Sequence, residues 1–167
     1  MLAASQHTIV YARFWRRAGA SILDGILLTA LSMLILVAGY GPTYVEWLRE
    51  PTTDGMYGWL DPVVNQLLPI ILPAIFWAQM GATPGKTLLD CRVVDAVTLK
   101  KISFARALLR SVAYIASFIP LGLGFLWVMW DKRAQGFHDK IAGTVVVVET
   151  DMWAEIQDEW INAGMPS

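Results

Sequence analysis

The composition of this chain excludes an ordinary soluble domain. Of its 167 residues, 56% are hydrophobic and 16% are charged, whereas about 25% of residues are charged in an average soluble domain. The formal net charge is −1, and the basic residues are spread along the borders of apolar stretches, which argues against nucleic-acid binding. A single cysteine, Cys91, excludes an internal disulfide and, with only two histidines, leaves no structural zinc site. We therefore expect a small membrane domain without metal or cofactor.

The first apolar stretch, residues 18–39, is predicted to cross the membrane as a helix. A helix needs about 20 apolar residues to span a bilayer, and this stretch meets that length. Three arginines precede it, Arg13, Arg16 and Arg17. The stretch is longer than the roughly 7–15 apolar residues of a cleavable signal sequence. We therefore expect an uncleaved anchor whose N-terminal side is cytoplasmic.

A carboxylate interrupts this first stretch at Asp24. An acid at that depth costs roughly 2.5–3.5 kcal/mol on insertion scales, so Asp24 must have a partner, a water-lined cavity or a function. Arg17 precedes it by seven residues. This spacing places the two side chains about 20° apart around a helix and roughly 10 Å apart along it. Arg17 can reach the membrane surface, whereas Asp24 is too deep to do so easily.

The second apolar stretch covers residues 60–80. It contains three prolines, Pro62, Pro69 and Pro73. Proline is tolerated in membrane helices where neighbouring groups satisfy the freed carbonyls, so a kinked second span is predicted. Asn65 and Gln66 lie near its start; such amides more often form hydrogen bonds between helices, and the other interpretation is that they line a polar pathway. Asp61, at the end of the stretch, is expected to be a solvated cap or an interface residue.

The third apolar stretch, residues 107–130, is interrupted at Pro120–Gly124. It either crosses the membrane once or turns back there as a short helical hairpin. The connection at 81–106 is rich in Lys and Arg and is predicted to be cytoplasmic, while the acidic connection at 40–59 faces outward. A single crossing would leave the basic residues at 132–140 on the outer side, against the positive-inside rule. We therefore favour the hairpin, which returns the C-terminus to the cytoplasm.

Two short β-branched runs, Arg92–Val94 and Val145–Val148, are flanked by turn-prone or polar residues. They either pair as a small cytoplasmic sheet or stay irregular at the membrane interface, and pairing requires both to lie on one side. Residues 149–167 are acidic, lack Lys and Arg, and carry apolar residues at helical spacing. The predicted fold is an all-α membrane domain at 1–148, with two clear spans, a kinked or hairpin C-terminal segment and this small β-pair. An acidic amphipathic tail follows at 149–167.

Several polar residues outside the first span have more than one interpretation. Gly81–Thr87 looks like a Walker A loop, but it lacks the first glycine and follows a membrane helix, so nucleotide binding is rejected. Lys86 then anchors at lipid headgroups or belongs to a backbone-amide anion site. Arg106 and Arg110, four residues apart, are expected on one helical face toward water or headgroups. His138 is either hydrogen-bonded at the interface or a proton relay.

Four groups of residues follow one another along the chain: Phe14–Asp24, Gly81–Lys86 with the following Arg92–Val94, Leu109–Arg110, and Gly136–Thr144. They resemble, in order, the landmarks of the RDD family of small bacterial membrane proteins, which is named for one arginine and two aspartates. The resemblance covers residues 11–148, and implies that Arg17, Asp24 and Asp139 are those three residues. It also implies transport, including cation/proton exchange, which is suggested for members of the family.

These three charged residues form the candidate site. Arg17 is expected to bridge the deep Asp24 and the shallow Asp139 at the membrane surface. The supporting residues are His138, Asn65, Gln66, Lys86 and Arg110. A low-dielectric site raises the pKa of an acid and a nearby guanidinium lowers it, so the triad can exchange protons, bind a small cation, or act as a static latch.

Transport of a small ion or solute, in particular cation/proton exchange, is the preferred function. Asp24 would bind the ion or proton, Arg17 would tune and gate it, and Asp139 would complete the network from the cytoplasmic side. Because so few helices can hardly enclose a pathway alone, we expect a homo-oligomer. We expect it in the bacterial inner membrane, with lipids as partners. No catalytic constellation is evident, and an enzyme is not predicted. The alternative is a non-transporting membrane scaffold or assembly factor in which the network is a latch.

Overall fold

The computed structural model describes residues 9–50 and 58–148, so the predicted tail at 149–167 lies outside the described residues. The first half contains α1 (Phe14–Tyr40), α2 (Pro42–Arg49), α3 (Leu60–Pro62), the π-helical turn η1 (Val63–Leu67) and α4 (Leu68–Met80). The second half contains α5 (Pro84–Leu88), β1 (Cys91–Asp95), α6 (Phe104–Phe118), α7 (Leu123–Leu126), the 3-10 turn η2 (Trp127–Met129), α8 (Phe137–Ala142) and β2 (Thr144–Val148). The fold is mostly helical, as predicted.

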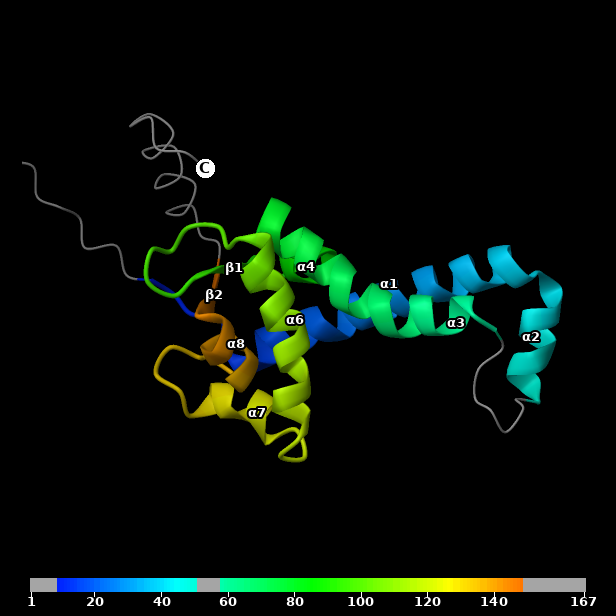
Figure 1. Ribbon diagram of the computed structural model, residues 1–167. Coiled ribbons are helices and arrows are strands. Elements are labelled where there is room, and N and C mark those ends of the chain that lie inside the picture. The colour runs from blue at the N-terminus through cyan, green and yellow to red at the C-terminus, as the bar shows by residue number, and fades with distance from the viewer. Residues whose placement is uncertain (1–8, 51–57, 149–167) are drawn as a thin grey trace, which may run out of the picture.

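Within the described residues, two helical segments are long and apolar enough to cross a membrane, and both coincide with predicted spans. They are α1, with 27 residues, and the 21-residue run from α3 through α4. The two run along the same arm of the molecule, with α2 at its far end (Figure 1). Large apolar side chains on α1, such as Ile22, Ile26 and Leu34, are exposed. They present a surface suited to lipid. The sequence did not reveal α2, which begins at Pro42 in the loop between the spans.

The predicted irregularity of the second span takes the form of a π-helical turn. The N–H of Leu68 donates to the carbonyl of Val63, five residues earlier. Pro62 and Pro69 flank the turn, and Pro69 has no N–H to continue the α-helical ladder. A π turn is often found at a functional site, and this one faces α1.

The third apolar stretch turns back, as favoured from the sequence. Helix α6 and the segment from α7 through η2 are bent by 113° relative to each other. Gly122 supplies a left-handed residue at the turn, with φ of 81°. A Cβ at Gly124 would lie 2.6 Å from the Cα of Ser117, so only glycine lets α7 fold back this closely on α6. The segment therefore forms a helical hairpin.

The two β-branched runs pair, as predicted, into an antiparallel sheet with Arg92 opposite Val147. The segment before α1 joins them, because Tyr11 bridges Val147 and the N–H of Ala12 donates to Val146. Residues 9–12, the connection before α6 and strand β2 thus lie at one end of the molecule (Figure 1). The core at that end includes the sheet, α4 and α6. Its buried members are Ala12, Ala74, Trp77, Cys91, Val93, Ile102, Ala107 and Val146.

Candidate functional site

Asp139 lies in the first turn of α8, at the centre of a buried charge network. The N–H of Gly136, just before the helix, donates to Asp139 Oδ2 at 3.0 Å, so the helix start orients the carboxylate. Arg17 Nη2 donates to Oδ2 at 2.5 Å. Arg110 donates to Oδ1 from Nε at 2.9 Å and from Nη2 at 2.7 Å. These bonds join α1, α6 and α8 through one carboxylate that is 0% exposed.

Two guanidiniums keep Asp139 ionised. Burial by itself would raise the pKa of this carboxyl, but Arg17 and Arg110 outweigh burial and hold the pKa well below its usual 3.8. Arg110 also lies over the Trp77 ring, 4.3 Å from the ring centroid, which stabilises its charge further. A buried acid that is fully paired in this way is suited to holding helices together, because removing either partner strands a buried charge.

His138 is a neutral member of the same network. Its ring is buried and stacks on Tyr114, with ring centroids 4.3 Å apart. Arg17 Nη2 lies 3.3 Å from Nε2, and a guanidinium can only donate. We therefore assign the ring proton to Nδ1, which lies 3.0 Å from Ser117 Oγ. Burial, together with the nearby positive charges, lowers the pKa of His138 to about 3. This geometry matches the hydrogen-bonded interpretation rather than a relay at neutral pH.

Asp24 faces the tight connection between α4 and β1. Thr83 Oγ1 donates to its Oδ2 at 2.5 Å, the N–H of Gly85 donates to Oδ1 at 2.7 Å, and Lys86 Nζ donates to Oδ2 at 3.3 Å. A Cβ at Gly85 would lie 2.5 Å from the carbonyl oxygen of Ala20. Only glycine therefore allows the connection to approach α1 closely enough for these three bonds.

The predicted headgroup contact of Lys86 is wrong, because the residue is only 4% exposed. Its ammonium is held by Asp24 and lies 5.6 Å from the centroid of the Trp77 ring. The other interpretation, an anion site formed by backbone amides, describes the connection between α4 and β1 better. The anion that this site holds is the carboxylate of Asp24, which accepts from the N–H of Gly85.

The predicted bridge from Arg17 to both acids is also wrong. Within the described residues, Arg17 pairs with Asp139, whereas Asp24 pairs with Lys86. Arg17 lies roughly 10 Å from Asp24 along the helix axis. The connection between α4 and β1, in contrast, places Lys86 directly against Asp24. Arg110, expected to face water or headgroups, is instead 0% exposed. Its position inside an apolar stretch was a signal that it needs a buried partner.

The remaining residues from the sequence prediction lie away from the two acids. Asn65 Nδ2 donates to Asp61 Oδ1 at 3.2 Å within the second span, and Gln66 is exposed. Asp61 was expected to be solvated, but it is 4% exposed and also accepts from Tyr44 Oη at 3.3 Å. Arg106 does not face headgroups alone, because it donates to an aspartate of β1 and so ties α6 to the sheet.

A cavity of about 740 Å³ adjoins Asp24 between α1, α4 and α6. Its polar end is formed by Asp24, Thr83 and Lys86. The rest of the wall is largely apolar, and includes Leu27, Leu28, Leu31, Leu72, Phe76, Trp77 and Phe118. The Asp24 side chain is 20% exposed. A mostly apolar cavity with a few convergent polar groups is typical of a ligand site, so Asp24 is the acid that a ligand can reach.

Comparison with known proteins identifies the family of this chain. The sequence pattern of the RDD family matches residues 11–143. The chain belongs to the RDD family. The match includes Arg17, Asp24 and Asp139, and the RDD protein described here is a membrane protein with two spans and a helical hairpin.

Relatives of this RDD protein come from several bacteria. The uncharacterized membrane protein YteJ of Bacillus subtilis is 28% identical over 85% of this chain and 84% of its own length. The uncharacterized protein YckC of the same species is 32% identical over 83% of this chain and 85% of its own length. The uncharacterized protein RP437 of Rickettsia prowazekii is 39% identical, but the match spans only 43% of this chain and 39% of the relative. No solved structure matches the fold.

Proposed function

We propose that this RDD protein transports a small ion or solute across the membrane, and that Asp24 binds the transported species or exchanges a proton with it. One observation carries this proposal. Asp24 lies within a membrane-spanning helix and is partly exposed to a cavity of about 740 Å³. Asp24 is paired with Lys86 and yet stays partly exposed to the cavity, and an ionisable residue within a membrane span that a ligand can reach is typical of a functional site.

The contacts of Asp24 suggest how binding is coupled to movement. Its cation partner is Lys86, whose flexible stem carries a compact point charge. A cation that enters the cavity competes with Lys86 for the carboxylate, and a proton on Asp24 removes the charge that holds the ammonium. Either event releases the connection between α4 and β1 from α1. Cation/proton exchange then follows if the two bind alternately.

In this proposal the Arg17–Asp139–Arg110 network is a latch and not part of the ion path. All three side chains are buried or nearly so, and the carboxylate oxygens are taken by both guanidiniums. The network holds α1 and α6 against α8, which fixes the wall of the cavity. Arg17 therefore acts on transport through the position of α1, instead of gating Asp24 directly as expected from the sequence.

We also propose the membrane in which the protein resides, its orientation there and its oligomeric state. We assign it to the bacterial inner membrane, with the sheet end in the cytoplasm, because the basic connection between the second and third apolar stretches lies at that end. Lipids contact the exposed apolar side chains of the spans. We expect a homo-oligomer, since two spans and a hairpin surround the cavity incompletely.

Ion flux through the purified protein in proteoliposomes tests this function. A trapped pH-sensitive dye reports proton movement after pulses of Na⁺, K⁺ and Li⁺. We expect a cation-dependent pH change that is abolished in Asp24→Asn. The matched control is Asp90→Asn, a change of the same kind at an exposed position with φ of 50°, which asparagine tolerates. Equal flux in wild type and Asp24→Asn would refute the role of Asp24.

The alternative of a non-transporting scaffold is favoured by one observation, the complete pairing of Asp139 between three helices. A scaffold needs only this latch. If neither the wild type nor the variant moves ions and Asp24→Asn is as unstable as a latch variant, the scaffold becomes the better interpretation.

A further inference from the structure

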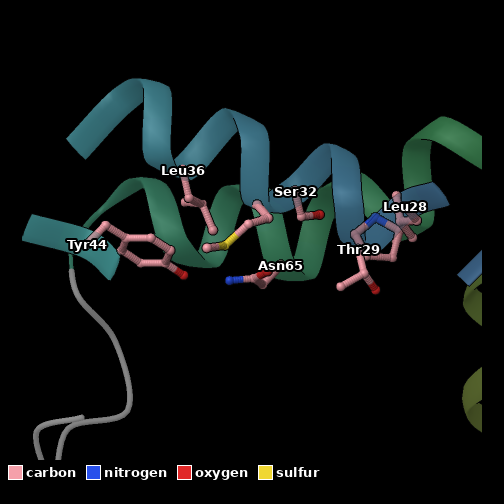
Figure 2. A pocket seen from close by; sticks show the side chains of 8 residues that line it. Leu28, Thr29, Ser32, Leu36, Tyr44 and Asn65 are labelled. Carbon is pink, nitrogen blue, oxygen red and sulfur yellow. The ribbon is translucent and has the colours of Figure 1, made fainter. Parts of the chain in front are cut away.

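A second cavity lies farther along the spans, away from the sheet. It is a groove of about 290 Å³ between α1, the start of α2 and the π-helical turn. Figure 2 shows its polar side chains, Thr29 and Ser32 from α1, Tyr44 from α2 and Asn65 from the π turn. Along α1, Ser32 lies about 12 Å beyond Asp24, so the groove is at membrane depth and separate from the Arg17–Asp139–Arg110 network.

Ser32 points to a ligand in this groove. The residue is 7% exposed and lines the groove. Within the described residues its hydroxyl has no hydrogen-bond partner. A hydroxyl that opens to a groove at membrane depth favours a polar partner, because lipid tails cannot satisfy it. The amide of Asn65 and the hydroxyl of Thr29 are exposed at the same place, where contact with lipid tails would be unfavourable. Water or a polar ligand removes both costs.

The oxygen atoms of the polar side chains that line the groove suit a cation. Hydroxyl, phenol and amide oxygens come from Thr29, Ser32, Tyr44 and Asn65, and hard cations prefer oxygen ligands. The charge comes from Asp61, whose Oδ1 accepts from both Tyr44 and Asn65. Asp61 thus adds negative charge behind the oxygens that line the groove. The volume of about 290 Å³ is that of several waters at about 30 Å³ each, so the ion can keep part of its hydration shell.

The groove adjoins the cavity at Asp24. Leu28 of α1 and Pro69 of α4 line both spaces. The π turn lies just before Pro69, so the two spaces follow one another between the same pair of helices.

We propose that this groove is a distal binding site for a partly hydrated monovalent cation, on the same route as Asp24. The inference rests on the proposed transport function, since it supplies the outer half of that route. Ser32 and Asn65 contact the ion, and Asp61 acts through Tyr44 and Asn65 as a positioning residue that also supplies charge.

Cysteine labelling tests the site without relying on transport. The single cysteine is replaced first (Cys91→Ala), and Ser32→Cys is compared with Leu34→Cys after reconstitution in liposomes. Leu34 is 67% exposed on the same helix and faces lipid. We expect a charged methanethiosulfonate to modify Ser32→Cys about tenfold faster or more, because only a hydrated thiol ionises to the reactive thiolate. If Ser32→Cys does not fold, Thr29→Cys is used in its place.

Protection by ions tests the ligand. Na⁺, K⁺ or Li⁺ should slow modification of the groove cysteine relative to N-methylglucamine, and Asn65→Ala should weaken this protection. Labelling no faster than at Leu34→Cys, or fast labelling that no alkali cation slows, overturns the proposal. Protection without any ion flux supports the site and counts against transport, whereas flux that depends on Asp24 with an unreactive groove refutes only the distal site.

Discussion

Asp139 and Asp24 are the two aspartates to which the family resemblance pointed, and each contacts a cationic side chain, yet their surroundings differ. Asp139 is completely buried, accepts from two guanidiniums and a backbone N–H, and joins three helices. Asp24 leaves 20% of its side chain exposed at a cavity, and its cation partner is a lysine on a short connection. The carboxylate of Asp139 is therefore enclosed by protein, whereas the carboxylate of Asp24 is open to the cavity on one side.

This difference shows that burial alone does not indicate which acid of a membrane protein has a function beyond holding helices together. A guanidinium presents a rigid fork that fits a carboxylate, whereas a lysine is a point charge on a flexible stem. The pair at Asp24 can therefore be exchanged at lower cost than the pairs at Asp139. We predict that variants at the two acids separate stability from function.

The largest effect is expected for Asp139→Asn. An amide leaves the guanidinium of Arg110, which is 0% exposed, without its anion. Breaking a buried pair in this way costs about 3–5 kcal/mol, so thermal unfolding in detergent should show a greatly destabilised protein. Asp90→Asn, at an exposed position, is the control and should unfold like the wild type. A wild-type unfolding profile for Asp139→Asn would show that the network is not a latch.

The latch should also respond to pH through His138. The pKa of this residue is 6.5 in an unfolded chain and about 3 in the folded protein. Between these values the unfolded state binds the extra proton, so stability falls as the pH decreases, by up to about 1.4 kcal/mol per pH unit. Unfolding measured from pH 7 to pH 4 should show this slope. His138→Gln should reduce it, and an unchanged slope would assign the pH dependence to another group.

A smaller effect is expected where the connection meets α1. Gly85→Ala would place a Cβ 2.5 Å from the carbonyl oxygen of Ala20 and 2.8 Å from the backbone nitrogen of Asp24. Such overpacking costs roughly 1–3 kcal/mol and should move Lys86 away from Asp24, reducing flux. Gly25→Ala is the matched control, because nothing lies within 4 Å of its Cβ. Equal behaviour of the two variants would contradict the close approach.

The smallest change in stability is expected for Asp24→Asn. The amide oxygen can still accept from Gly85, whereas the bond that Thr83 donates and the pair with Lys86 are lost. Because Lys86 lines the cavity, its flexible ammonium can turn to water there. We therefore expect a smaller loss of stability than for Asp139→Asn, measured by the same unfolding experiment, together with the complete loss of flux. A loss as large as that of Asp139→Asn would make both acids structural and remove the contrast between them.

Several features were predictable because they depend on local properties of the chain. Hydropathy predicted both spans, Pro120–Gly124 predicted the hairpin, and the β-branched runs at 92–94 and 145–148 predicted the sheet. Length and residue type decide these features within one segment. The motif order also predicted the family and pointed to Arg17, Asp24 and Asp139 as one site.

Only the tertiary structure decided which charges meet. Arg17 turned out to hold Asp139 and not Asp24, Lys86 to hold Asp24 and not lipid, and Arg110 to be buried instead of exposed. These pairings join residues 62 to 122 positions apart, or 29 for Arg110 and Asp139. Ion pairs depend on distances of a few ångströms between elements, and periodicity within one helix carries no information about which neighbour packs against it. The sequence by itself therefore determined the spans, while helix packing determined which charged residues meet.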